Sequence, residues 1–163
     1  MNTIARLLMI AVLALPLAAC NKAEEAPKEA EKAPVAVPVN DDASAWRAYV
    51  TDVVGRHMDG VTSAPFVYLL PSEASEDFQG SYDRLLDKAK SDVSRGILKG
   101  NMLAYASPNS AKTADLIVAA FADVKPDKLK GVKLLFIGKA EDDERVKAAV
   151  AASGVDYIFV EAK

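Results

Sequence analysis

The stretch "NMLAYASPNSAKTADLIVAAFADV", residues 101–124, decides the fold together with the run "VKLLFIG", residues 132–138. Two short apolar runs flank a segment in which apolar residues recur every three or four positions. The runs predict strands buried on both faces, and the recurrence between them predicts a helix. Because no hairpin turn joins the two strands, we expect them to run parallel, with the helix as their crossover.

The same alternation extends over the rest of the chain from residue 43. Helical spacing occurs in residues 42–60, 80–96 and 141–154, and short apolar runs occupy residues 65–71 and 155–160. A helix followed by a strand, four times over, predicts an α/β domain of three layers: a four-stranded, mostly parallel sheet with helices on both faces. The crossovers should be right-handed.

This outline resembles small doubly wound domains such as the flavodoxin-like group. On that basis we predict the strand order 2-1-3-4, with the alanine-containing second strand, "MLAYAS", at an edge of the sheet.

The segment "ASPNSAKT", residues 106–113, has the spacing of a phosphate-binding P-loop, but alanine stands at both glycine positions. A P-loop needs glycine because its backbone NH groups approach the phosphate closely. Ala106 and Ala111 each add a Cβ, and Pro108 removes an NH group. In a simpler interpretation, Ser107 caps the next helix and Pro108 occupies its first position. We therefore predict no nucleotide binding, and at most a modest anion site at this helix start.

The first twenty residues have the layout of a secretory signal. A charged start, "MNTIAR", precedes the apolar run "LLMIAVLALPLAA", which is too short to span a bilayer. The run ends in Leu17-Ala18-Ala19-Cys20, which resembles the lipobox of bacterial lipoproteins. The resemblance implies that residues 1–19 are removed and that lipid on Cys20 anchors the protein in a membrane.

Asn21 follows the cysteine, at the position where Asp usually signals retention in the inner membrane. The resemblance therefore favours the outer membrane of the cell envelope, with the folded domain facing the periplasm. The alternative interpretation is a buried cysteine that follows a transmembrane anchor.

Residues 21–42 consist mainly of Ala, Glu, Lys and Pro, and contain no aromatic residue. Such a segment buries too little apolar surface to offset the entropy of ordering, so we predict that residues 20–42 are the lipidated cysteine and a disordered tether. Residues 43–163 then form a single domain, which we expect to be monomeric. Its acidic and basic side chains nearly balance, which predicts no nucleic-acid partner.

Ligands of open parallel sheets bind beyond the carboxyl ends of the strands. Polar residues follow the first three predicted strands in residues 71–81, 107–110 and 138–141, so we predict a binding surface formed by these loops. The residues expected to contribute to it are Ser72, Glu76, Ser107, Asn109, Ser110, Lys112 and Glu141.

Other features give no coherent catalytic set. His57 lies near the end of the first predicted helix, and no nucleophile motif accompanies it. The acids at 141–144 lack the spacing of an EF-hand, and we interpret them as a solvated helix start favoured by the helix dipole. Cys20 is the only cysteine, so no disulfide or cysteine-based metal site is expected. We predict no catalytic residue, metal or cofactor.

The sequence therefore favours a non-enzymatic envelope lipoprotein whose α/β domain binds a protein or cell-wall partner. The alternative is a periplasmic small-ligand binder or hydrolase that uses the same loops, because a Ser-Lys pair can act without histidine.

Overall fold

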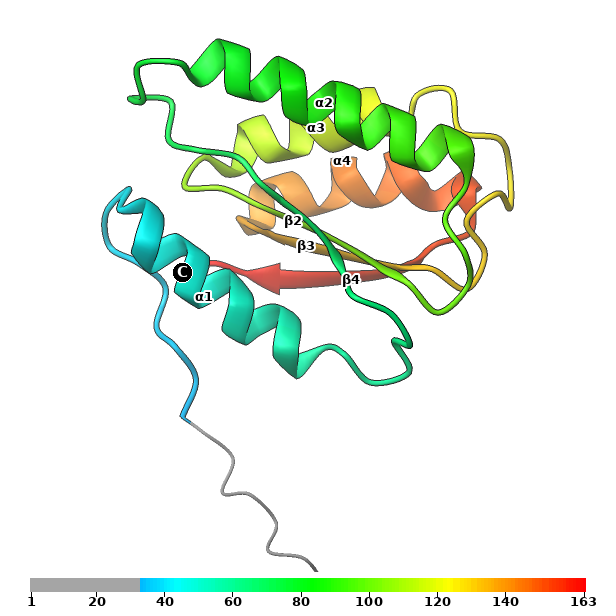
Figure 1. Ribbon diagram of the computed structural model, residues 1–163, viewed down its shortest axis with the longest axis horizontal. Coiled ribbons are helices and arrows are strands. Elements are labelled where there is room, and N and C mark those ends of the chain that lie inside the picture. The colour runs from blue at the N-terminus through cyan, green and yellow to red at the C-terminus, as the bar shows by residue number, and fades with distance from the viewer. Residues whose placement is uncertain (1–32) are drawn as a thin grey trace, which may run out of the picture. The chain divides into compact units, whose positions relative to one another are not determined.

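The structure is a computed structural model, and it describes residues 33–163. Cys20 and the lipobox lie outside the described residues. The strands are β1 (Phe66–Leu69), β2 (Met102–Ala106), β3 (Lys133–Gly138) and β4 (Asp156–Glu161). The helices are α1 (Ala43–Arg56), α2 (Phe78–Arg95), α3 (Ser110–Phe121) and α4 (Ala140–Val150), and a short 3-10 helix, Ala151–Ser153, follows α4 (Figure 1).

The predicted fold class is confirmed. All four strands pair in parallel, and helices cover both faces of the sheet. Strand β2 is buried throughout, as its continuous apolar run predicts. Each helix follows its apolar stripe, and Asp42 caps α1 by accepting a hydrogen bond of 2.7 Å from the Ala45 backbone NH.

The predicted strand order is wrong. The order is β1-β2-β3-β4, so β2 is internal and the edges are β1 and β4. Each crossover moves one strand further in the same direction, so right-handed connections place α2, α3 and α4 on the same face. The small side chains of Ala104 and Ala106 in β2 leave room for Trp46 and Tyr49 of α1 to pack against the centre of the sheet.

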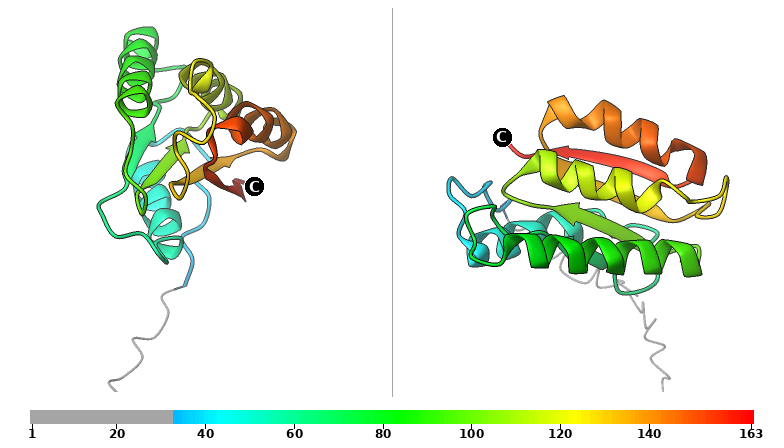
Figure 2. Two further views of the ribbon diagram at one scale, coloured as in Figure 1. Left: turned by 90° about the vertical axis from the view of Figure 1, so that its right-hand side faces the viewer. Right: turned by 90° about the horizontal axis from the view of Figure 1, so that it is seen from above.

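The two faces of the sheet are covered unequally. Within residues 33–163, helices α2, α3 and α4 pack side by side on one face, whereas α1 is the one helix on the other (Figure 2). Along the strands, Tyr68 and Tyr105 face the three helices, and Leu69 and Ala104 face α1. One helix cannot cover four strands, so the sheet on either side of α1 must be covered by another segment.

The flank of α1 beside β4 is covered by part of the predicted tether. Val37 packs against the same apolar cluster as Ile158 and Val160, and the Trp46 indole NH donates a hydrogen bond of 3.0 Å to the Asn40 carbonyl. The compact unit therefore begins at Ala33, N-terminal to the predicted start at residue 43. No helix in residues 33–163 is both long and apolar enough to cross a bilayer.

Candidate functional site

The start of α3 differs from the prediction. Asn109, and not Ser107, is the N-cap: its side-chain oxygen accepts a hydrogen bond of 3.1 Å from the Lys112 backbone NH. The buried Ser107 hydroxyl instead accepts a bond of 2.9 Å from the Asn109 NH and holds the turn before the helix. Pro108 lies in that turn, outside the helix. The chain therefore enters α3 through an ordinary capped turn.

Ser110 joins α3 to α4. Its hydroxyl donates a hydrogen bond of 2.6 Å to the Asp142 carboxylate and accepts one of 2.8 Å from the Lys139 backbone NH. Asp142 also receives two hydrogen bonds from the Arg145 guanidinium. Asp142 is buried, so the acidic start of α4 is only partly solvated, in contrast to the prediction.

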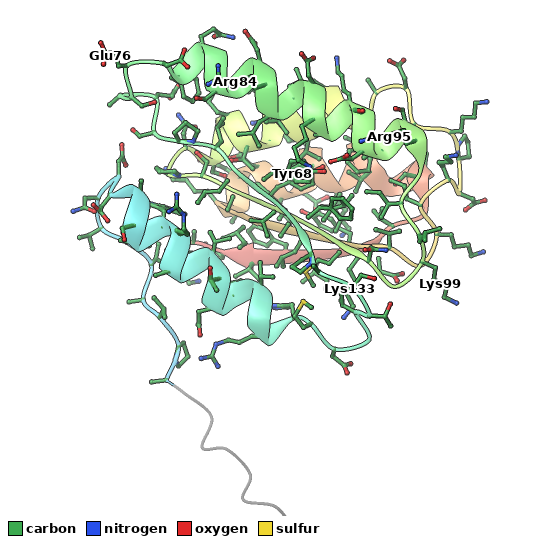
Figure 3. All side chains as sticks on the ribbon, in the orientation of Figure 1. Tyr68, Glu76, Arg84, Arg95, Lys99 and Lys133 are labelled. Atoms are coloured by element: carbon green, nitrogen blue, oxygen red, sulfur yellow. The ribbon has the colours of Figure 1, made fainter. Side chains whose placement is uncertain are left out.

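The remaining predicted residues fall into two groups. Ser72 donates a hydrogen bond to Asp41, and Asn109 donates one to Glu73, whose carboxylate lies 3.7 Å from the Lys112 ammonium. Glu76 and Glu141 are exposed and make no side-chain contact of this kind within residues 33–163. Figure 3 places Glu76 at the tip of the loop before α2.

The carboxyl ends of the strands therefore carry a connected set of loops. A cavity of about 300 Å³ lies among Ser107, Ser110, Lys139 and the segment around Val37. However, a sheet whose strands follow in chain order has no point at which the order reverses, and that reversal is what opens a crevice in doubly wound folds. The Ser72, Ser107 and Ser110 hydroxyls bond to carboxylates or backbone NH groups, and no Ser-Lys side-chain pair is present among the described contacts.

A second polar group, the tyrosine–aspartate cluster, lies on the opposite face of β1 from α1. It comprises Tyr68, Lys88, Asp92, Arg95 and Tyr105. The Asp92 carboxylate accepts hydrogen bonds of 2.7 Å from the Tyr68 hydroxyl, 2.5 Å from Lys88 and 2.9 Å from Arg95. The rings of Tyr68 and Tyr105 stack with their centres 4.5 Å apart.

The charges of this cluster follow from its burial. Burial by itself would raise the pKa of the Asp92 carboxyl, but the hydrogen bonds from Lys88, Tyr68 and Arg95 outweigh it and hold that pKa below its ordinary value. Burial raises the pKa of both tyrosines, so both are neutral phenols. The Tyr105 hydroxyl is buried and has no hydrogen-bond partner within the described part of the chain.

A third feature, the α1–β1 groove, lies on the flank of α1 that the N-terminal segment leaves open. Its walls include Val50, Thr51, Gly55 and Met58 on one side and Val67 and Leu69 of β1 on the other. The groove encloses about 310 Å³ and is lined almost entirely by apolar atoms. Val67 is 44% exposed, which is unusual for a valine in the strand of an α/β sheet.

Sequence reasoning missed both the cluster and the groove. Asp92 lies on the inward stripe of α2, next to Val93 and three residues after Ala89. A carboxylate at such a position signals a buried partner, because carboxylates are almost never buried unpaired. No pattern in the sequence indicates the groove, because the groove depends on how far one helix extends over the sheet.

Within residues 33–163, no three His, Cys, Asp or Glu side chains gather as metal ligands would. His57 follows α1 as its C-cap, and its ring Nδ1 lies 2.7 Å from the Val53 carbonyl oxygen. Comparisons of the chain with protein-family models, with curated proteins and with solved structures found no match, so the assignment of a function rests on the residues described above.

Proposed function

We propose that this protein is a lipid-anchored, non-enzymatic protein of the bacterial cell envelope whose domain binds a protein partner in the α1–β1 groove. The observation that carries the proposal is the unequal covering of the α1 face. The N-terminal segment covers the flank beside β4, and nothing in residues 33–163 covers the flank beside β1.

The lining of the groove favours a protein over a cell-wall partner. Glycans and peptidoglycan present hydroxyl and amide groups, which need hydrogen-bond partners when they are desolvated. The groove offers Val50, Met58, Val67 and Leu69, which gain free energy only by contacting other apolar groups, at about 25 cal/mol per Å² buried. Apolar side chains of a protein meet that requirement.

Anchoring is the first part of the proposal that can be tested. Changing Cys20 to Ser removes the thiol that the lipobox resemblance assigns to the lipid. In bacteria that carry out lipoprotein processing, we expect the Cys20→Ser chain to lose incorporation of labelled palmitate and to accumulate at precursor size. Labelling equal to that of the wild type would contradict the anchoring proposal.

The groove can be tested with two substitutions of one residue. Gly55 lies on α1 in the wall of the groove, and a Cβ there meets no atom within 4 Å. Both Gly55→Ala and Gly55→Leu should stabilise the helix by about 0.5–1 kcal/mol, but only the leucine side chain extends into the groove. We expect Gly55→Leu to reduce co-purification of a stoichiometric partner from detergent-solubilised envelopes at least tenfold, and Gly55→Ala to leave it unchanged.

This pair separates binding from folding, because the two variants should be equally well folded. If the leucine variant recovers the same partner in the same amount, the groove is not the binding site. In that case Glu76→Ala, at the loop before α2, would show whether the loops after the strands are used instead.

A further inference from the structure

We infer that the partner enters as an extended strand that pairs with the free edge of β1 and is apolar on one face and acidic on the other. This inference rests on the proposed function, because it states what kind of protein segment the α1–β1 groove accepts.

The backbone of β1 supplies the first argument. Within residues 33–163, strand β1 pairs only with β2, and the Leu70 NH donates to the Ala106 carbonyl at 3.0 Å. Since backbone groups of alternate residues in a parallel strand point to opposite sides, Val67 and Leu69 direct their NH and carbonyl groups away from β2. In Figure 1, residues 66–69, coloured between cyan and green, lie at the front of the sheet, and no other part of residues 33–163 is drawn in front of them between α1 and α2. The edge is therefore open to an added strand.

The two sides of an added strand would meet different surroundings. Side chains directed toward α1 would enter the groove beside Val67, which is apolar. Side chains directed toward α2 would meet the charged end of the tyrosine–aspartate cluster, where the Lys88 ammonium lies 5.5 Å from the Phe66 ring centre and 4.9 Å from that of Tyr68. Because side chains alternate between the two faces of a strand, a segment of alternating apolar and charged residues would match both sides.

The charges beside β1 determine the sign of the polar face. Lys88 and Arg95 lie on the α2 side of β1, which the polar side chains of an added strand would face, and Asp92 is the one carboxylate of the cluster. Figure 3 shows Arg95 at the end of α2. This local excess of cations contrasts with the net charge of −3 of the whole chain.

The same charges argue against a second copy of this chain at the edge. Pairing β1 with β1 of another copy around a twofold axis would bring two sets of Lys88 and Arg95 close together, and like charges repel each other. An acidic segment would instead gain from them, chiefly in its association rate and specificity.

The test uses the full chain in a mild detergent and a fluorescent seven-residue peptide of alternating glutamate and valine. We expect it to bind in fluorescence anisotropy, with affinity falling as salt is added. A peptide with lysine in place of glutamate, and a glutamate–valine peptide N-methylated on alternate amides, should each bind at least tenfold more weakly. Hydrogen exchange of the Val67 and Leu69 amides should slow when the acidic peptide is added.

Variants of the protein make the test independent of the peptide chemistry. Lys88→Gln should weaken binding about tenfold, equivalent to about 1.4 kcal/mol, whereas Lys147→Gln, an exposed change on α4, should leave it unchanged. Val67→Pro removes one outward NH donor from an edge position that tolerates proline, and it should abolish the exchange protection at Leu69.

The outcomes separate this inference from the proposed function. Equal binding of the N-methylated peptide, with unchanged exchange at Val67 and Leu69, would overturn strand pairing while the groove still binds. Equal binding of the lysine peptide would overturn the acidic face. If peptide binding appears only after Glu24, Glu25, Glu29 and Glu31 are changed to Gln, the chain's own residues 21–32 fill the edge, and the partner assignment is overturned. If the acidic peptide binds the Gly55→Leu variant as tightly as the wild type, the groove is not the binding site, and both binding proposals are wrong.

Discussion

Replacing Asp92 with Ala should lower the free energy of unfolding by about 3 kcal/mol. The substitution removes the acceptor of the Tyr68 hydroxyl, which is buried beside the Tyr105 hydroxyl, and Tyr105 already lacks a partner within residues 33–163. Two stacked phenols would then lie in an apolar layer without an acceptor. The Lys88 and Arg95 side chains are largely exposed, so they return to water at little cost. Urea denaturation of both proteins measures the difference.

Three control variants identify the cause of the loss. Asp92→Asn keeps an acceptor oxygen and should cost less than half as much. Tyr68→Phe removes the hydroxyl that needs the acceptor, so Asp92→Ala should cost less in that background than in the wild type. Tyr105→Phe removes an unsatisfied hydroxyl and should be neutral or stabilising. Equal costs for Asp92→Ala with and without the Tyr68 hydroxyl would mean that this bond does not stabilise the fold.

The pH dependence of Asp92 has a definite sign. Its pKa in the folded protein lies below the ordinary value of about 4 for an aspartate, so folding favours the ionised carboxylate. The stabilisation is fully present above the unfolded value and is lost as the pH falls through the lower, folded value. The difference in stability between wild type and Asp92→Asn should therefore be constant near neutrality and should shrink below about pH 4.

Replacing Gly138 with Ala should destabilise the fold to a similar extent, by about 3 kcal/mol. Gly138 ends β3, and a Cβ there would lie 2.6 Å from the Ser110 hydroxyl oxygen and 2.8 Å from Cε2 of Phe136. The Phe136 ring is fully buried, and the Ser110 hydroxyl is held by Asp142 and the Lys139 NH. Neither neighbour has space to move, so the methyl group must distort the junction of β3, α3 and α4.

The matched control is Gly55→Ala, since a Cβ at that position meets no atom within 4 Å. The two substitutions add the same methyl group. The midpoint temperature of thermal unfolding should rise for Gly55→Ala and fall for Gly138→Ala. A cost below about 1 kcal/mol for Gly138→Ala would show that the Phe136 ring and Ser110 can relax, and that the junction is not tightly packed.

The candidate site was only partly predictable. The sequence placed Ser107, Asn109, Ser110 and Lys112 at the start of one helix, and the structure confirms that they lie together there. Both Ser107 and Asn109 are good caps, so the sequence could not decide which of the two caps the helix. Because Asn109 is the cap, Asn109→Ala should cost about 1 kcal/mol of stability in addition to any effect on binding.

The sequence by itself determined the type and order of the elements, because apolar spacing along residues 43–163 reports how each segment meets a neighbour. It also determined that the strands run parallel, since each pair is separated by a helix. Only the tertiary structure decided the strand order. That order depends on the face of the sheet to which each crossover helix packs, and Ala89 and Val93 of α2 share one buried cluster with residues of α3 and α4. The same nonlocal packing leaves α1 as the one helix on its face within residues 33–163, and this opens the groove and exposes Val67 beside it.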